Sequence, residues 1–460
     1  MITIAEIPQR LAAQRTYFNS QKTKPYQFRY HQLERLEAAV KKYEAEVFAA
    51  LKSDLGKSTA EAFLGEVGFL YEELKFTKKN LKCWMKPKRV ATPMTLAVGK
   101  SRIHYEPLGV SLIIAPWNYP YQLLLTPLVA AIAAGNCAAV KPSELAPATA
   151  RLVSKIIEET FPPEYVWSIE GAADVSTALL KERWDHVFFT GSIGVGKIVM
   201  KAAAEHLTPV TLELGGKSPC IVDESVDMDV ATRRIAWGKY LNAGQTCVAP
   251  DYLLVPKGSQ QRIVEKISAH LDTFFGRTPS TSPEYSRIVS ERHYDRLHGM
   301  LGQGTVVVGG QGNRAEKYLA PTLLTEPKLD SPLMQEEIFG PLLPIVEYSS
   351  FDEAVKFVQD REKPLALYYF GNDPAHRDRV VGSLSFGGGC INDTLVHLSN
   401  PRLPFGGVGT SGMGGYHGWY SFEAFSHRKS VLDRATWFDL NLRYYPYADK
   451  LPWLRRMMGS

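Results

Sequence analysis

The sequence predicts an α/β fold with two doubly wound parallel sheets. Short apolar runs alternate twice along the chain with longer segments of helical periodicity, a pattern typical of parallel strands joined by crossover helices. The 460 residues are 45% hydrophobic and 22% charged, as in ordinary globular proteins, and suffice for two or three domains. We expect one domain at 1–212, a second at 213–392, and a C-terminal segment at 393–460 that returns to the first.

The elements of the first domain follow from apolar spacing. Apolar residues recur at spacings of three and four from Leu33 to Leu51, which predicts one amphipathic helix ending near Gly56. A projecting hairpin is expected at about 90–106. The alternating run then predicts strands at 110–114, 137–140 and 187–189, and helices at 120–134, 148–160 and 194–206.

A second alternating run begins after residue 217. It predicts strands at 218–222, 252–255, 366–370 and 387–391, and helices at 229–241 and 261–275. The glycine-rich stretch 405–418 is expected to be a loop, because glycine lets the backbone approach a ligand or another chain closely.

Bulk composition excludes several classes of protein. The net charge of +5 is dispersed along the chain, which does not favour a nucleic-acid partner. The five cysteines are unevenly spaced, and the histidines lack metal-ligand spacing, so we expect neither a disulfide framework nor a metal site. The segment Met1–Glu6 lacks the features of a secretory signal, and the apolar stretch Leu123–Ala134 is too short to span a bilayer. We expect a cytoplasmic protein.

Cys247 is the strongest candidate for a catalytic residue. A thiolate is the best side-chain nucleophile near neutral pH, although a lone cysteine is more often a small core residue. The preceding Gly244-Gln245-Thr246 is turn chemistry that a core strand rarely carries. The other cysteines lie in apolar sequence surroundings and are interpreted as structural: Cys83, Cys137, Cys220 and Cys390.

Two further residues fit chemistry at a carbonyl carbon. Glu213 ends an apolar strand before Gly215-Gly216, where partial burial would raise the pKa of the carboxyl and make it a better general base. Asn118 lies at a strand-to-helix turn, where its amide could hold an oxyanion. A solvated strand-end glutamate and a helix cap are the alternatives for these two residues.

The stretch 189–197 predicts an anion site, because it follows an apolar strand and opens a helix. Gly191 to Lys197 nearly matches a P-loop, but Ile198 stands where a hydroxyl must hold magnesium, which leaves a dinucleotide turn as the better interpretation. Lys141 and Glu144 follow another strand and could bind ribose hydroxyls or a 2′-phosphate, with an exposed charged loop as the alternative.

Seven motifs in order then resemble the signature of NAD(P)-dependent aldehyde dehydrogenases. They cover nearly the whole chain: 116–120, 141–144, 189–196, 213–219, 245–247, 337–341 and 404–418. The short N-terminus and the run from Leu403 to Gly418 resemble the class 3 branch, which includes fatty and aromatic aldehyde dehydrogenases. The resemblance implies two Rossmann-like domains, one cofactor-binding and one catalytic, and a small β oligomerisation arm.

The resemblance also implies roles for individual residues. Cys247 would be the nucleophile, Glu213 the base that activates the deacylating water, and Asn118 an oxyanion donor, and NAD or NADP would be the cofactor. The cofactor contacts would be Trp117, Lys141, Ser143, Glu144, Gly191, Ser192, Gly196, Leu214, Glu337 and Phe339. An apolar substrate tunnel would be lined by Tyr119, Trp237, Phe405 and Tyr416.

The expected function is oxidation of a medium-chain, long-chain or otherwise extended apolar aldehyde to its carboxylic acid. The class 3 resemblance implies a homodimer. The basic, apolar tail Leu451–Met458 could touch a membrane surface or cover the tunnel, with a frayed terminus as the alternative. A non-catalytic binding relative and, more weakly, a P-loop-like nucleotide triphosphatase remain the alternative functions.

Overall fold

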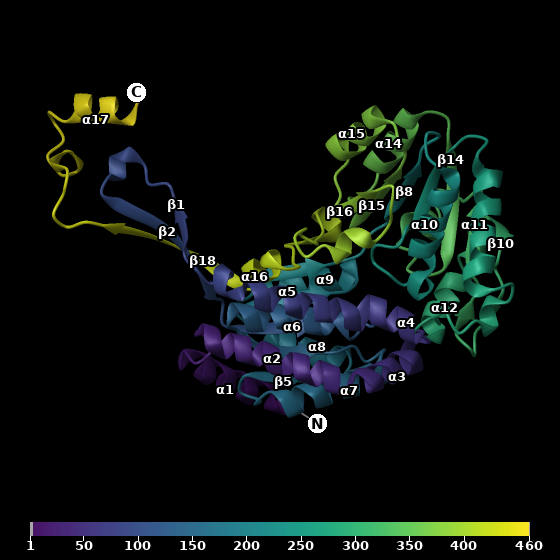
Figure 1. The fold of residues 1–460 in the computed structure, drawn as a ribbon, viewed down its shortest axis with the longest axis horizontal. Helices are drawn as coiled ribbons and strands as arrows, with labels where there is room; N and C mark the ends of the chain where they lie inside the picture. Colours follow the sequence, from purple (N-terminus) through teal and green to yellow (C-terminus); the bar gives the residue numbers. More distant parts are fainter. Residues whose placement is uncertain (1–2, 460) are drawn as a thin grey trace.

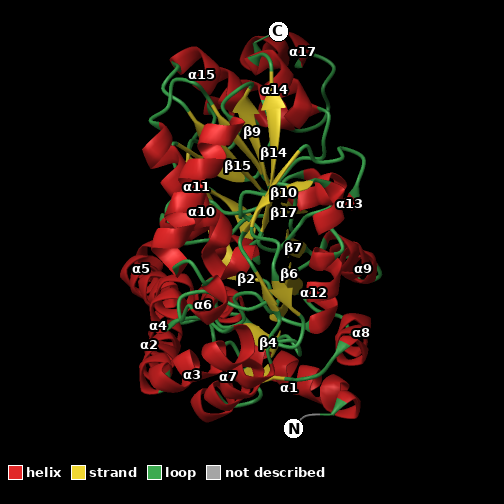
Figure 2. Ribbon diagram, turned by 90° about the vertical axis from the view of Figure 1, so that its right-hand side faces the viewer, coloured by secondary structure: helices red, strands yellow, loops and turns green. Residues whose placement is uncertain are grey.

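The computed structural model describes residues 3–459 and shows two α/β units from which a thin arm projects (Figure 1). Met1 and Ile2, on which part of the localisation expectation rests, and Ser460 lie outside the described residues. Each unit has a central, mostly parallel sheet with helices on both sides (Figure 2). This arrangement confirms the predicted fold class.

The first unit has a six-stranded sheet in the order β17-β7-β6-β3-β4-β5. Its strands are β3 (Val110–Ile114), β4 (Cys137–Lys141), β5 (Val166–Ser168), β6 (His186–Thr190), β7 (Val210–Glu213) and β17 (Gly412–Met413). Its helices are α1 (Ile7–Asn19), α2 (Tyr26–Lys42), α3 (Glu44–Leu55), α4 (Thr59–Ala62), α5 (Gly68–Trp84), α6 (Gln122–Ala134), α7 (Pro147–Thr160), α8 (Ala173–Lys181) and α9 (Ile193–Ala204). The chain enters at β3 and winds outward in both directions, as a doubly wound sheet does.

The second unit has a seven-stranded sheet in the order β10-β13-β14-β9-β8-β15-β16. Its strands are β8 (Pro219–Val222), β9 (Tyr252–Pro256), β10 (Thr305–Val308), β13 (Thr322–Thr325), β14 (Leu342–Tyr348), β15 (Ala366–Phe370) and β16 (Gly388–Ile391), beside a small ladder of β11 (Gly312–Asn313) and β12 (Tyr318–Leu319). Its helices are α10 (Met228–Tyr240), α11 (Gln260–Phe275), α12 (Glu291–His298), α13 (Pro332–Gln335), α14 (Phe351–Gln359) and α15 (Pro374–Ser383).

The arm joins an early hairpin to the end of the chain. Strands β1 (Lys88–Val90) and β2 (Gly99–Pro107) form the hairpin, and β18 (Ser426–Arg434) pairs antiparallel with β2 along its whole length. Helix α16 (Trp419–Ala424) precedes β18, and α17 (Leu451–Met458) lies at the tip of the arm, yellow in Figure 1. The expected hairpin is therefore present, and the C-terminal segment supplies the third strand of the arm.

Two local expectations need correction. The single helix expected up to Leu51 is two helices, α2 and α3, separated at Tyr43, whose backbone leaves the helical region at φ −102° and ψ 11°. Tyr43 is itself buried, so the apolar periodicity runs through the bend without interruption and cannot reveal it. The expected loop at 405–418 contains the short strand β17, in which Gly412 pairs with Glu213 at the edge of the first sheet.

Helix α6 is buried on all sides, as expected for its long apolar run. Within residues 3–459, no helix combines the length and apolar character that crossing a membrane requires.

Candidate active site between the two sheets

One edge of the first sheet gathers most of the predicted polar residues. Glu213 is the last residue of β7, Lys141 is the last residue of β4, and Asn118 follows β3 in the turn that leads to α6. Gly191 and Ser192 follow β6, and the Gly191 N–H donates a hydrogen bond to the Glu213 carbonyl (3.0 Å). Because these strands are parallel neighbours, their carboxyl ends bring these residues to one edge, where open α/β sheets bind ligands.

Cys247 comes from the opposite unit, on the loop between α10 and β9. Just before it, Asn242, Ala243 and Gly244 all have left-handed backbone, with φ of 52°, 51° and 74°. A Cβ at Gly244 would overlap the carbonyl of Gly340, so only glycine fits that position. Two consecutive non-glycine residues in this region are uncommon and indicate a loop that its surroundings hold in place.

Two buried carboxyl groups act on the thiol at this site. Burial raises the pKa of the Cys247 thiol, and the negative charges of Glu337 and Glu213 raise it further. The Glu213 side chain is 2% exposed, and neither of its carboxylate oxygens has a hydrogen-bond partner. Burial raises the pKa of Glu213 well above its ordinary value. A thiol and an unpaired carboxyl group therefore share one desolvated site, the environment in which carboxyl groups become general bases near neutral pH.

The Asn118 amide reaches the loop that carries the thiol. Its Nδ2 donates to the Gln245 carbonyl (3.0 Å), two residues before Cys247. An amide NH₂ has two donors, so one remains for a ligand while the other fixes the orientation of the group. Next to it, the hydroxyls of Tyr119 and Thr246 hydrogen-bond to each other (2.8 Å).

The turn after β6 fits the phosphates of a dinucleotide. Ser192 caps α9 by accepting from the Val195 N–H (3.4 Å), and Gly194 has open space around its Cα. A Cβ at Gly196 would lie 2.6 Å from Leu214 Cδ2, so glycine is needed for α9 to pack against Leu214. A helix N-terminus of this kind attracts anions.

The other predicted cofactor residues lie at or after the ends of β3 and β4 and in the loop before β14. Lys141 Nζ donates to Glu144 (3.0 Å), and Ser143 Oγ accepts from the Leu145 N–H (3.3 Å). The rings of Trp117 and Phe339, one from each unit, meet edge to face with centroids 5.2 Å apart.

Glu337 is a buried carboxyl group with an unused oxygen. Its Oε1 has no hydrogen-bond partner, and a Cβ at Gly215 would overlap the carboxylate. Burial, with the charge of Asp251, raises the pKa of Glu337 to about 8. An orphaned buried acceptor beside a glycine is what a polar ligand such as a ribose requires, so these residues fit a dinucleotide.

Three of the four predicted tunnel residues are buried aromatic side chains. Tyr119, Phe405 and Tyr416 are buried, and the rings of Phe405 and Tyr416 are 5.7 Å apart. The charge of Cys247 acts on both Tyr119 and Tyr416. Trp237 differs, because its side chain is 38% exposed on α10.

Sequence reasoning missed two features of this region. His417 is buried with neither ring nitrogen hydrogen-bonded, and it stacks on Phe405 with centroids 5.4 Å apart. The Gln245 carbonyl that holds Asn118 was also missed, because a main-chain acceptor leaves no mark in a sequence. Cys83 was expected to be a structural residue in apolar surroundings, and this expectation is wrong. The residue is exposed on α5, because the apolar residues beside it in the sequence lie on another face of the helix.

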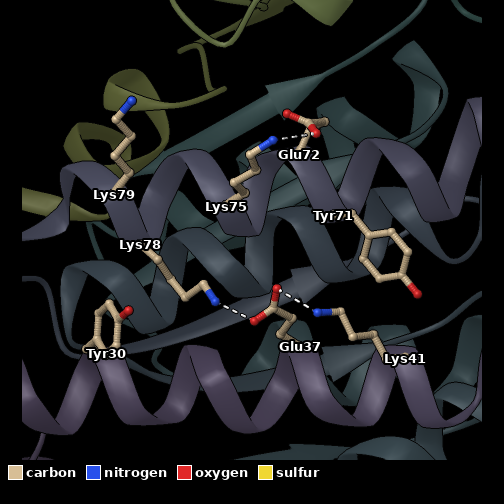
Figure 3. A pocket seen from close by; sticks show the side chains of 8 residues that line it. All are labelled: Tyr30, Glu37, Lys41, Tyr71, Glu72, Lys75, Lys78 and Lys79. Carbon is tan, nitrogen blue, oxygen red and sulfur yellow. Dashed lines mark hydrogen bonds and ion pairs between the residues drawn. The ribbon is translucent and has the colours of Figure 1, made fainter.

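A surface pocket of about 430 Å³ lies between α2 and α5 (Figure 3). It contains none of the predicted site residues. Its charges are largely paired, since Glu37 accepts from Lys78 and Lys41, and Lys75 donates to Glu72.

Among the residues that the structure describes, no group of three or more histidine, cysteine or acidic side chains could hold a metal ion.

Comparison with known proteins agrees with this geometry. Residues 2–431 match the model of the aldehyde dehydrogenase family. The chain is 49% identical over 451 residues to 4,4'-diaponeurosporen-aldehyde dehydrogenase of Staphylococcus aureus, covering 98% of each protein. It is 47% identical to the dimeric NADP-preferring aldehyde dehydrogenase of Rattus norvegicus, covering 95% of this chain and 97% of the relative.

The fold agrees equally well with a solved structure. The substrate-bound state of Staphylococcus aureus AldH superimposes with a TM-score of 0.97 at 48% identity, covering both chains completely. The seven ordered motifs and the class 3 resemblance thus predicted the relationship correctly. The chain belongs to the aldehyde dehydrogenase family and is an NAD(P)-dependent enzyme that oxidises aldehydes.

Proposed function

We propose that the Cys247 thiolate attacks the aldehyde carbon and forms a tetrahedral thiohemiacetal. The proposal is supported by the hydrogen bond from Asn118 to the loop of Cys247, and by the negative charge of Glu213, which raises the pKa of the thiol. The free donor of the Asn118 amide stabilises the oxygen of this intermediate, a contribution of about 10²–10³ in rate for one such donor. Bound NAD(P)⁺ supplies the two-electron oxidation that converts the thiohemiacetal to a thioester.

Glu213 is the base in the second half of the reaction. Its buried carboxylate takes a proton from water, which attacks the thioester and releases a carboxylic acid. The absence of hydrogen bonds to either oxygen supports this role, because no residue in the described range 3–459 holds the carboxylate. The product is therefore the free acid, and hydrolysis releases Cys247 as the thiolate with which the next turnover begins.

The cofactor would be held by residues that lie at strand ends and in loops of both units. The N-terminus of α9, with Gly191, Ser192 and Gly196, holds the pyrophosphate, and Glu337 accepts from the ribose next to the nicotinamide. Lys141, Ser143 and Glu144 hold the adenosine ribose. Trp117, Leu214 and Phe339 form the walls around the cofactor.

The substrate is a medium-chain, long-chain or otherwise extended apolar aldehyde. Buried Tyr119, Phe405 and Tyr416 give the approach to the thiol an aromatic lining, which favours alkyl chains over charged substrates. Trp237, exposed on α10, could contribute only at an outer entrance.

The proposal also covers how the chain assembles, how it divides into domains and where it acts. The chain forms a homodimer through the arm, and the boundaries at residues 212 and 392 separate the cofactor-binding domain, the catalytic domain and the returning C-terminal segment. Exposed Trp453 and Met458 beside Arg455 and Arg456 suit α17 for peripheral contact with a membrane. The enzyme otherwise acts in the cytoplasm.

The test is spectrophotometric. Reduced nicotinamide is followed with NAD⁺ and NADP⁺ over aldehydes of increasing chain length, for the natural enzyme and for Cys247→Ala. The proposal expects kcat/KM to rise with chain length and to vanish in the variant. Turnover that survives in Cys247→Ala contradicts the mechanism, and a preference for short polar aldehydes contradicts the substrate class.

A further inference from the structure

Three buried charged residues that take no part in the proposed reaction contact two loops. One loop carries Asn118, the oxyanion donor, and the other carries Cys247, the nucleophile. They are Lys57, Glu61 and Glu66, all from the segment between α3 and α5. Lys57 and Glu66 form an ion pair of 2.5 Å in which both side chains are 0% exposed. A buried pair of this kind is costly to desolvate, so its presence is weak evidence for stability and invites another explanation.

The Lys57–Glu66 pair holds the loop of Asn118 from two sides. Lys57 Nζ donates to the Asn118 carbonyl (2.9 Å) and lies 4.0 Å from the centre of the Tyr119 ring. Glu66 Oε2 accepts from the backbone N–H groups of Tyr121 (2.9 Å) and Gln122 (3.2 Å), where α6 begins. Both ends of the short turn that carries the oxyanion donor are thereby fixed by one ion pair.

Glu61 holds the other loop. Its Oε1 accepts from the Asn242 N–H (2.6 Å), and its Oε2 accepts from Ser286 Oγ (3.0 Å). Asn242 Nδ2 in turn donates to the Asn118 carbonyl (2.8 Å) and to the Gln245 carbonyl (3.2 Å). The left-handed backbone at Asn242 thus has a charged partner that stabilises it, five residues before the thiol.

The helix geometry explains how both glutamates reach these loops. Residues five apart on an α-helix point about 140° away from each other. Between α4 and α5 the chain forms a π-helical turn at Phe63–Val67, which contains Glu66. Its wider i→i+5 spacing reduces the angle between Glu61 and Glu66, and π-turns are frequent at functional sites.

We infer that Lys57, Glu61 and Glu66 are positioning residues that set the distance between the Asn118 amide and the Cys247 sulfur. This inference rests on the proposed function of Asn118 and Cys247. The three residues do not touch the aldehyde; they act through the Asn118 carbonyl and the Asn242 N–H. A displacement of about 1 Å in such a constellation can slow the chemical step by about 100-fold.

The test is a double-mutant cycle on the rate of the first turnover. Lys57→Met with Glu66→Gln removes both partners of the ion pair together, so that neither is left buried without the other. We expect the pre-steady-state rate of nicotinamide reduction to fall by about 10- to 100-fold at saturating cofactor. In an Asn118→Ala background the same two changes should slow the reaction by less than about twofold, because they act through Asn118.

Arg29→Met is the matched control. Arg29 is a buried cation that donates to the Ala133 carbonyl (3.0 Å) at the opposite end of α6. Its loss should lower the melting temperature but leave the first-turnover rate unchanged. If the Lys57 and Glu66 changes lower only the melting temperature, as this control does, the inference is wrong; independent, multiplicative losses with Asn118→Ala also overturn it.

Two further measurements cover the cases in which the double variant does not fold or Asn118 is not the oxyanion donor. If the double variant does not fold, Glu61→Gln alone replaces a charge-assisted hydrogen bond with a weaker neutral one and should slow the first turnover by at least about threefold. An unchanged rate in Glu61→Gln then overturns the inference. A normal rate in Asn118→Ala by itself refutes the proposed oxyanion donor rather than the positioning network, so the two failures are distinguishable.

Discussion

Replacing Glu213 with glutamine separates the two halves of the proposed reaction. The substitution keeps the shape of the side chain and removes the buried carboxylate, both of whose oxygens lack partners. Acylation of Cys247 does not need this base, whereas hydrolysis of the thioester does. General bases contribute about 10²–10⁴ in rate, so we expect turnover to fall by about that factor.

The assay is stopped-flow absorbance at high enzyme concentration. Glu213→Gln should release one reduced nicotinamide per active site in a burst, followed by turnover at least about 100-fold slower than in the natural enzyme. Cys247→Ala, as the control, should show neither phase. Full steady-state turnover in Glu213→Gln, or a burst without any later slowing, would refute the role of this carboxyl group.

The same variant has a consequence for stability that depends on pH. Burial raises the folded-state pKa of Glu213, so the folded enzyme binds this proton more tightly than the unfolded chain does. Stability from this group is present below the ordinary carboxyl pKa and is lost as pH rises through the raised pKa. We therefore expect Glu213→Gln to melt higher than the natural enzyme at alkaline pH, while the natural enzyme needs that same pH for fast deacylation.

Three further predictions address the neighbouring groups. Asn118→Ala should lower kcat/KM by about 10²–10³, measured with a good aldehyde, and a loss under tenfold would exclude an oxyanion donor. Glu337→Gln should speed alkylation of Cys247 by iodoacetamide at pH values above about 8, because Glu337, whose pKa is raised to about 8, is ionised there and its negative charge raises the thiol pKa. Exposed Cys83 is the internal reference, and equal rates in both enzymes would contradict this. Glu144→Gln should lower the KM for NADP⁺ several-fold relative to NAD⁺, since it removes an anion from the 2′-phosphate side, and an unchanged ratio would place that phosphate elsewhere.

Sequence reasoning identified residues whose chemistry and turn context are both visible in a short stretch. Cys247 after a Gly-Gln-Thr turn and Glu213 before two glycines are of this kind, and so is the strand–turn–helix of the dinucleotide turn. The alternation of apolar runs with helical segments was likewise sufficient to predict several parallel strands of each sheet. The ordered motifs added the family, and with it the role of the hairpin in an oligomerisation arm.

The remainder depends on contacts between distant segments. Lys57, Glu61 and Glu66 look like a solvated, charged helix face in the sequence, and only packing against two loops reveals their partners. Strands β10, β13 and β14 were not predicted, because β10 and β13 have only four residues each and Pro344 interrupts the apolar run of β14. Trp237 is 38% exposed on α10, a degree of exposure that a single sequence does not determine, and its place in the tunnel stays a prediction.

Mass spectrometry of the trapped intermediate tests the central claim most directly. Glu213→Gln is mixed with a long-chain aldehyde and NAD(P)⁺, quenched in acid within the burst and digested. The proposed mechanism predicts that the peptide containing Cys247 gains the mass of the acyl group, and that Asn118→Ala in the same background slows the appearance of this adduct. An unmodified Cys247 after a full burst, or an acyl group on Cys83 or Cys390 instead, would contradict the account.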